Sequence, residues 1–484
     1  MPNRQHAGQA KAATAVVVGG GIAGLVSARE LALQGIDVTV FEASGHCGGC
    51  VRRHDVAGFL LDAGAESFAT RSKAVSDLAE ELGLGDELVQ PDPAGAWLQL
   101  PESARPLPKS GILGIPADPM EPGVIAAIGR AAALRAAADK VLPLGNLLGK
   151  DRLSLGELVR TRMGHSVLER LVTPVAAGVY SADPDVLDVD SVAPGLRASV
   201  ASHGSLQAAV GAMRKAAPAG SAVAGINGGM GRLTEALLAD LAQRGVSVRT
   251  KARVSAVSKH DGEWRVESAA GTFQAQGLVI AADGGSAVDL LAPGLPGFEG
   301  LRPEPGPAVA LVTLVLDEPE LDAHPRGTGL LVAAGADRIR AKALTHATAK
   351  WPWLAAQTGP GTHVLRLSYG RATGKPESAR GEDFTGWADE ALYRQALADA
   401  TELMGVPVAD ADILGWKVVR WTAALPSATV GHRDRVAAVR ELAGTWERLQ
   451  LAGAWLAGTG LVAVVTDARA RSRQLAAELA APPS

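Results

Sequence analysis

Three glycines near the start of the chain are spaced as the binding of a dinucleotide phosphate requires. Gly19, Gly21 and Gly24 form a GxGxxG pattern. An apolar run at 15–18 precedes the pattern, and apolar residues at helical spacing follow it. Such glycines permit a tight turn and let backbone N–H groups at a helix N-terminus approach a pyrophosphate. Glu42 ends the next expected strand, where an acid bonds a ribose hydroxyl. The spacing therefore predicts a strand, turn and helix that bind FAD or NAD.

Later glycines favour FAD over NAD. Gly48 and Gly49 form a second pair shortly after Glu42, and a late loop from Gly453 to Gly460 precedes an expected helix. A nicotinamide cofactor rarely needs contacts from such distant segments, whereas the flavin of FAD lies far from its adenine. We therefore expect FAD to contact all three segments.

The composition describes a globular protein. The chain has 484 residues, of which 47% are hydrophobic and 20% charged, enough to bury a large core. A net charge of −4 disfavours nucleic-acid binding, and two cysteines exclude a scaffold of disulfides. The longest charge-free apolar stretch, 451–466, is too short to span a bilayer. These features predict a soluble, cytoplasmic protein with at most peripheral membrane contact.

Strand and helix signals alternate in a way that predicts an α/β fold built from separated pieces. The buried strands and glycine loops indicate one Rossmann-like cofactor domain, into which an α+β substrate domain is inserted. Asp261 followed by Gly262 between two alternating segments predicts a hairpin. The expected division is a loose tail at 1–13, cofactor-binding pieces at 14–89, 223–295 and 416–484, a helical substrate piece at 90–222 and a second substrate piece at 296–415.

Several motifs occur in the order typical of one enzyme family. The segments, in chain order, are DAGAESF at 62–68, GVYSADP at 178–184, KWP at 350–352, 366–370, 420–421, GHR at 431–433 and the glycine loop at 453–460. In these motifs the sequence resembles the FAD-dependent porphyrinogen oxidases of haem synthesis, from about residue 15 to 479. The resemblance implies a FAD domain of the glutathione-reductase or amine-oxidase type, with non-covalent FAD.

The resemblance also places the cofactor contacts. Together with the glycine loops, it implies FAD-binding residues at Gly19, Gly21, Ile22, Ala23, Gly24, Glu42, Ala43, Gly48, Gly49, Gly64, Ala65, Glu66, Val254, Trp421, Gly453, Gly460, Leu461 and Val462.

Three departures from the family pattern concern the flavin environment. Residues 461–464 read LVAV, where the family usually has an apolar residue, Pro, Asp and Cys. Residues 427–429 lack the aromatic that often precedes the Gly–His pair, and Cys50 replaces a common basic residue. Cys47 and Cys50 form a CxxC that could serve redox or metal chemistry, although the chain has no further cysteine. We favour cofactor contact, because it already explains the glycines between them.

The resemblance implies a porphyrinogen substrate, a mostly apolar macrocycle with propionate carboxylates. Arg71 lies where the family tends to place a substrate-facing basic residue, so its guanidinium would bind a carboxylate; a solvated arginine at a helix start is the alternative. Backbone near Gly178 would face the pyrrole N–H groups or form a turn that packing requires. Lys350 would bind substrate or stack on Trp351. His432 suggests a base, but a structural role is favoured.

The implied reaction needs no side-chain nucleophile. Hydride would pass from a meso carbon to the flavin in three rounds that remove six electrons, and O2 would regenerate the flavin with release of hydrogen peroxide. The chain resembles Gram-positive members that act on coproporphyrinogen III and pass coproporphyrin to a ferrochelatase. Protoporphyrinogen IX is the alternative substrate. An amine oxidase, a carotenoid desaturase and a non-catalytic porphyrin-binding flavoprotein of this fold stay open, and the sequence specifies no oligomeric state.

Overall fold

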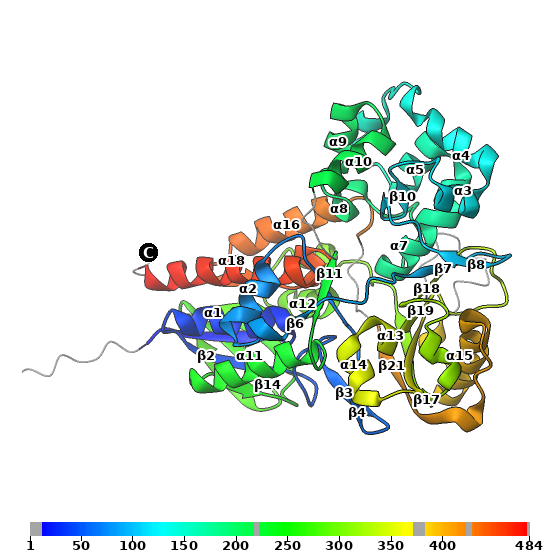
Figure 1. Cartoon of the computed structure of the whole chain (residues 1–484). Coiled ribbons are helices and arrows are strands. Elements are labelled where there is room, and N and C mark those ends of the chain that lie inside the picture. The colour runs from blue at the N-terminus through cyan, green and yellow to red at the C-terminus, as the bar shows by residue number, and fades with distance from the viewer. Residues whose placement is uncertain (1–11, 217–221, 371–382, 423–427, 482–484) are drawn as a thin grey trace, which may run out of the picture.

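A parallel β-sheet forms the centre of the cofactor-binding part of the computed structural model, which describes residues 12–216, 222–370, 383–422 and 428–481 (Figure 1). Its order is β12-β2-β1-β16-β22. The strands are β1 (Thr14–Val18), β2 (Asp37–Phe41), β12 (Ser247–Arg249), β16 (Gly277–Ile280) and β22 (Leu449–Leu451). This sheet and its helices confirm the predicted α/β fold. All but the last two residues of the tail predicted at 1–13 lie outside the described residues.

Both faces of the parallel sheet are covered, which explains why β1 is apolar throughout. Val17 packs with helices on one face, whereas Val16 and Val18 pack with Trp264 on the other. The helices on the first face are α1 (Ile22–Leu33), α2 (Ala74–Glu81), α11 (Gly231–Gln243) and α18 (Leu461–Ala480). The second face carries an antiparallel sheet of β13 (Val254–His260), β14 (Glu263–Ser268) and β15 (Gly271–Ala275), together with α12 (Gly284–Leu291).

The turn between β13 and β14 is the predicted hairpin. Asp261 and Gly262 have φ angles of 49° and 83°, the left-handed conformation that a two-residue hairpin loop requires. The hairpin prediction is confirmed.

A second, seven-stranded sheet lies beside the first unit (Figure 1). Its order is β21-β17-β20-β19-β18-β7-β8, with β21 (Ile413–Trp421), β17 (Val309–Asp317), β20 (Thr362–Tyr369), β19 (Ala343–His346), β18 (Gly329–Val332), β7 (Trp97–Gln99) and β8 (Ala104–Pro106). Helix α15 (Asp389–Met404) packs on one face. The sequence predicts that the second substrate piece ends at 415 and that the last cofactor-binding piece begins at 416. Strand β21 crosses that boundary, because its pairing with β17 extends to Trp421.

Helices form a separate core above the seven-stranded sheet (Figure 1). They include α3 (Pro122–Ile128), α4 (Arg130–Ala137), α5 (Leu155–Met163), α7 (Thr173–Tyr180), α8 (Val189–Val192), α9 (Leu196–His203) and α10 (Leu206–Ala216). The hairpin of β3 (Arg53–Val56) and β4 (Phe59–Asp62) contacts β17 and β21, and its Arg53 pairs with Glu235 of α11, so it links the seven-stranded sheet to a helix of the cofactor-binding part. Within the described ranges, no helix is long and apolar enough to cross a membrane.

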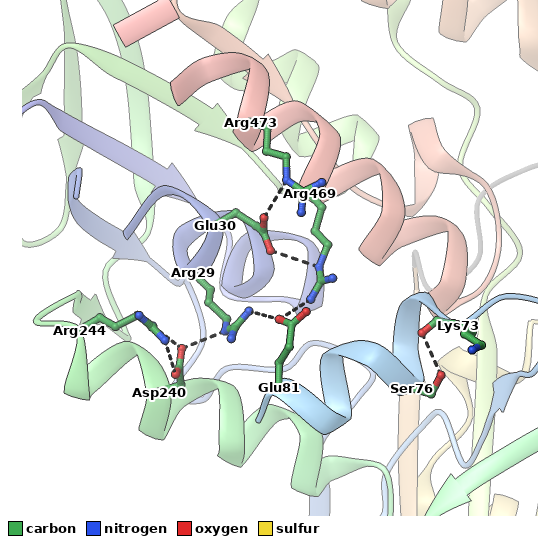
Figure 2. Close-up of polar contacts among 9 residues, drawn as sticks. All are labelled: Arg29, Glu30, Lys73, Ser76, Glu81, Asp240, Arg244, Arg469 and Arg473. Carbon is green, nitrogen blue, oxygen red and sulfur yellow. Dashed lines mark hydrogen bonds and ion pairs between the residues drawn. The ribbon is translucent and has the colours of Figure 1, made fainter. Parts of the chain in front are cut away.

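Charged side chains between α1, α2, α11 and α18 form a connected network (Figure 2). Arg29 is only 4% exposed, and it bonds Asp240 at 3.0 Å and Glu81 at 2.5 Å. Glu81 also accepts from Arg469, which in turn pairs with the buried Glu30. Burial acts to raise the pKa of Glu81, but the two arginines outweigh it and lower the pKa. The network holds the helix that follows the GxGxxG loop against the C-terminal helix.

Arg29→Ala is expected to lower the free energy of unfolding by about 2–3 kcal/mol, because it removes two charge-assisted hydrogen bonds at a buried site. Arg473→Ala is the matched control: its side chain is 65% exposed, so we expect a loss of at most about 1 kcal/mol. Urea unfolding of both variants measures the difference. Equal losses would show that the Arg29 pairs add no stability beyond that of a surface pair.

Candidate cofactor and active site

The GxGxxG loop opens the N-terminus of α1 toward a cavity. A Cβ added at Gly24 would lie 1.9 Å from the Gly19 carbonyl oxygen, so this glycine allows the helix to pack against β1. A Cβ added at Gly21 would meet no protein atom within 4 Å. Gly21 is therefore free of packing constraints and leaves its backbone open to a ligand.

The second glycine pair packs against the first loop. The Gly48 N–H donates to the Gly20 carbonyl at 2.8 Å, and Gly49 lies close to Gly21. A Cβ at Gly48 would come within 2.5 Å of the Val51 carbonyl oxygen. The two motifs thus form one continuous backbone surface, although a helix and a strand separate them in the sequence.

A cavity of about 390 Å³ lies beside this surface. Of the predicted cofactor residues, it is lined by Gly21, Ile22, Ala23, Gly48, Gly49, Gly453 and Leu461. Lining residues that the sequence reasoning missed include Ala281, Ala282, Asp283, Arg302 and Arg435, whereas Trp455 belongs to the predicted loop 453–460. The predicted residues that do not line it are Gly19, Gly24, Glu42, Ala43, Gly64, Ala65, Glu66, Val254, Trp421, Gly460 and Val462.

Two of the predicted residues outside the cavity lining have contacts that explain their positions. Glu42 accepts hydrogen bonds from the backbone N–H groups of Gly20, at 2.8 Å, and Ser44, at 2.7 Å. The carboxylate therefore lies beside the glycine loop at the end of β2. Val254 packs in the core with Phe41.

The segment that follows β4 is held by a buried group of charges. Arg366, in β20, donates to the Gly64 carbonyl at 2.7 Å and pairs with Glu66 at 2.9 Å. Lys350 pairs with the second oxygen of Glu66 at 3.3 Å and lies over the Trp351 ring. Burial acts to raise the pKa of Glu66, but the two cations outweigh it and lower the pKa. The predicted substrate residue Lys350 therefore occupies a largely buried ion pair.

Asp62 and Trp421 fix the same segment at its other end. The Asp62 carboxylate accepts from the backbone N–H groups of Met230 and Gly231, at the start of α11. Burial raises its pKa to about 6. The Trp421 indole donates to the Ala63 carbonyl at 3.0 Å. The predicted FAD-binding residues Gly64 and Ala65 thus follow a segment that is anchored to α11 and to the seven-stranded sheet.

The predicted substrate residues Arg71 and Gly178 belong to different parts of the fold. A Cβ at Gly178 would lie 2.5 Å from a Leu331 methyl, so α7 packs tightly on β18 at this glycine. Arg71 is exposed, with no hydrogen bond or ion pair to any residue that the structure describes. Burial raises the pKa of Tyr180, two residues after Gly178 on α7, and the nearby Arg71 charge partly opposes that rise. The fold thus brings Arg71 near α7.

The cysteines are poor candidates for redox or metal chemistry. Burial, together with the Glu42 charge, raises the pKa of Cys47 to about 11, and burial also raises the pKa of Cys50. The reactive thiolate form is therefore disfavoured at neutral pH. Across the described ranges, no group of three His, Cys, Asp or Glu side chains is placed to hold a metal.

Comparison with known proteins shows to which family the chain belongs. Residues 22–479 match the family model described as flavin containing amine oxidoreductase. The chain belongs to this family. It is therefore an FAD-dependent oxidoreductase.

Individual relatives agree with the motifs. Coproporphyrinogen III oxidase of Mycobacterium tuberculosis (strain H37Rv) is 30% identical, over 93% of this chain and 94% of the relative. The enzyme of the same name from Bacillus subtilis (strain 168) is 28% identical, over 94% and 96%. A solved structure from Exiguobacterium sp. 255-15, described provisionally as a protoporphyrinogen oxidase, has a TM-score of 0.82 and 27% identity, over 97% and 99%. The predicted resemblance to porphyrinogen oxidases is confirmed.

The residues of the cavity fit FAD. The α1 N-terminus and the open Gly21 suit a diphosphate, since helix N-termini favour anions. Trp455 lines the cavity with a buried indole N–H that has no partner within the described residues. A second helix N-terminus, at Leu461 of α18, meets the same cavity. A bound FAD would satisfy these donors, and the chemistry that it supplies is two-electron oxidation.

Gly21→Ala is expected to keep the fold but lower FAD content, because its methyl would enter the space beside the α1 N-terminus. Gly24→Ala should destabilise the fold itself, because the methyl would collide with Gly19. Flavin absorbance per protein and thermal unfolding separate the two effects. A Gly21→Ala protein with wild-type FAD content and affinity would contradict the assignment of the cavity.

Proposed function

We propose that this protein is an oxygen-dependent FAD oxidase that removes six electrons from coproporphyrinogen III to form coproporphyrin III. The observation that carries the proposal is that one face of the seven-stranded sheet connects the segment of the predicted FAD-binding residues 64–66 with α7. The proposal also draws on the names of the relatives, which act on porphyrinogens.

A row of directly paired residues runs across this sheet face, in the order Val419, Leu311, Ser368, Ala343 and Leu331. Directly paired residues point to the same face of a sheet. At one end, Val419 and Leu311 cluster with Ala63 and Trp421. At the other end, Leu331 contacts α7 at Gly178. The row is apolar or small throughout, which suits one side of a flat macrocycle.

The row and the residues around it would have different roles in binding the porphyrinogen. The apolar row would hold the macrocycle and exclude water, while Arg71 near α7 would bind a propionate by charge-assisted hydrogen bonds. Arg366 and Glu66 would act indirectly, by holding the backbone at 64–65 in place. Because bound FAD supplies the oxidising chemistry, correct placement of an easily oxidised macrocycle makes a strong protein base unnecessary.

Protoporphyrinogen IX is the second candidate substrate, favoured by the description of the Exiguobacterium structure. It carries two carboxylates where coproporphyrinogen III carries four. The expected transfer of the product, coproporphyrin III, to a ferrochelatase stays a prediction.

A paired assay tests the proposal. The purified yellow protein receives coproporphyrinogen III or protoporphyrinogen IX at equal concentration in air, and porphyrin fluorescence and peroxide are followed against a control without enzyme. We expect a clear preference for coproporphyrinogen III. Equal or reversed rates would assign the protein to protoporphyrinogen, and no turnover of either by the FAD-bound protein would overturn the porphyrinogen assignment.

Arg71→Ala is expected to raise the KM for coproporphyrinogen about tenfold or more, because a hydrogen bond between charged groups contributes about 1.5–3 kcal/mol. FAD content should stay unchanged. Lys73→Ala, an exposed cation two positions along, is the matched control and should leave the KM within about twofold. An unchanged KM in Arg71→Ala would remove Arg71 from the substrate site.

A further inference from the structure

A helix outside the glycine motifs also reaches the FAD cavity. Helix α16 (His432–Gly444) follows Gly431. Its residues His432 and Arg435 line the same cavity as Gly21 and Ile22 at the N-terminus of α1. The cavity therefore receives side chains of α16 as well as the backbone of α1.

The guanidinium of Arg435 has one nitrogen with a hydrogen bond to the protein and another that is buried without one. One terminal nitrogen donates to the Thr429 hydroxyl at 3.1 Å. Its Nε is buried and has no hydrogen-bond partner among the described residues, and no carboxylate of the described ranges pairs with it. A buried, unsatisfied guanidinium N–H is costly. Other arginines of the described ranges also have such an Nε, but Arg435 is the one among them that lines the cavity, where an anionic ligand could accept from it.

The cavity is also lined by Arg302, Asp283, His432 and the carboxylate of Glu304. Arg302 pairs with Asp289. Asp283 accepts from the Ser286 N–H at 3.0 Å, as the cap of α12. Burial lowers the pKa of His432, and the Arg435 charge lowers it further, so this imidazole is neutral at pH 7. Of the two arginines that line the cavity, Arg435 is therefore the one without an ion pair to a described residue.

We propose that Arg435 binds the diphosphate of FAD, which thus receives a full positive charge from α16 in addition to the partial charge of the α1 N-terminus. The partial charge of a helix end is roughly half an elementary charge, less than a diphosphate requires. A guanidinium matches phosphate oxygens geometrically and donates through several N–H groups. The inference concerns the cofactor and is independent of which substrate is oxidised.

The experiment measures FAD binding directly. Release of FAD from the diluted holoenzyme is followed by flavin fluorescence in wild type, Arg435→Ala, Arg435→Lys and Arg433→Ala. Arg433 is the matched control, since it lies on the same helix, is exposed, and donates instead to the Asp190 carbonyl. We expect the FAD dissociation constant to rise about tenfold to a hundredfold in Arg435→Ala, less in Arg435→Lys, and less than about twofold in Arg433→Ala.

A second readout separates cofactor binding from a purely structural role. If Arg435 binds the diphosphate, a large excess of FAD should restore the Tm of Arg435→Ala toward that of wild type, because ligand binding stabilises by mass action. Wild-type FAD affinity in Arg435→Ala, an equal loss in Arg433→Ala, or a Tm deficit that saturating FAD does not reduce would each overturn the proposal. If Arg435→Ala yields no folded protein, the same criteria apply to Arg435→Lys.

Discussion

The ion pair between Glu66 and Arg366 joins the segment after β4 to the seven-stranded sheet, and the geometry of the site depends on it. A carboxylate buried at this depth is stable only when cations and hydrogen-bond donors surround it. Arg366 comes from the middle of β20, and its second contact is the carbonyl of Gly64. The same side chain therefore neutralises Glu66 and sets the position of the backbone beside it. A displacement of this segment from the seven-stranded sheet would separate two buried charges, so the docked arrangement is strongly favoured over a slipped one.

This docking brings the functional segments to one place. The backbone at 64–65 rests on the face of the seven-stranded sheet that carries Leu311 and Val419, and α7 packs on the same face at Leu331. Helix α7 belongs to the helical core, whereas 64–65 follows the first cofactor strands. The sheet therefore acts as the common surface on which a cofactor segment and a substrate helix are aligned.

The positive charge at the cofactor cavity comes from helix N-termini and from arginine side chains, while other charged side chains hold the surrounding helices together. The N-termini of α1 and α18 direct unpaired N–H groups at the cavity. The network around Arg29 and Glu30 holds these two helices together on the outer side. Near the cavity, by contrast, Arg435 keeps an unsatisfied N–H. The paired charges thus stabilise the scaffold, whereas Arg435, which has no ion pair to a described residue, lies where a ligand can reach it.

The sequence by itself determined the features that depend on short-range geometry. The GxGxxG turn, the hairpin at Asp261 and the apolar strand β1 could be read from it, because each follows from the conformations and spacing of neighbouring residues. The family also followed from motifs that span the chain. Only the tertiary structure decided that Lys350 lies in a buried ion pair with Glu66, that β21 extends the seven-stranded sheet to Trp421, and that Arg435 reaches the cavity. These depend on contacts between residues hundreds of positions apart, such as Arg366 with Gly64, and a single sequence carries no local signal of which distant charges will meet.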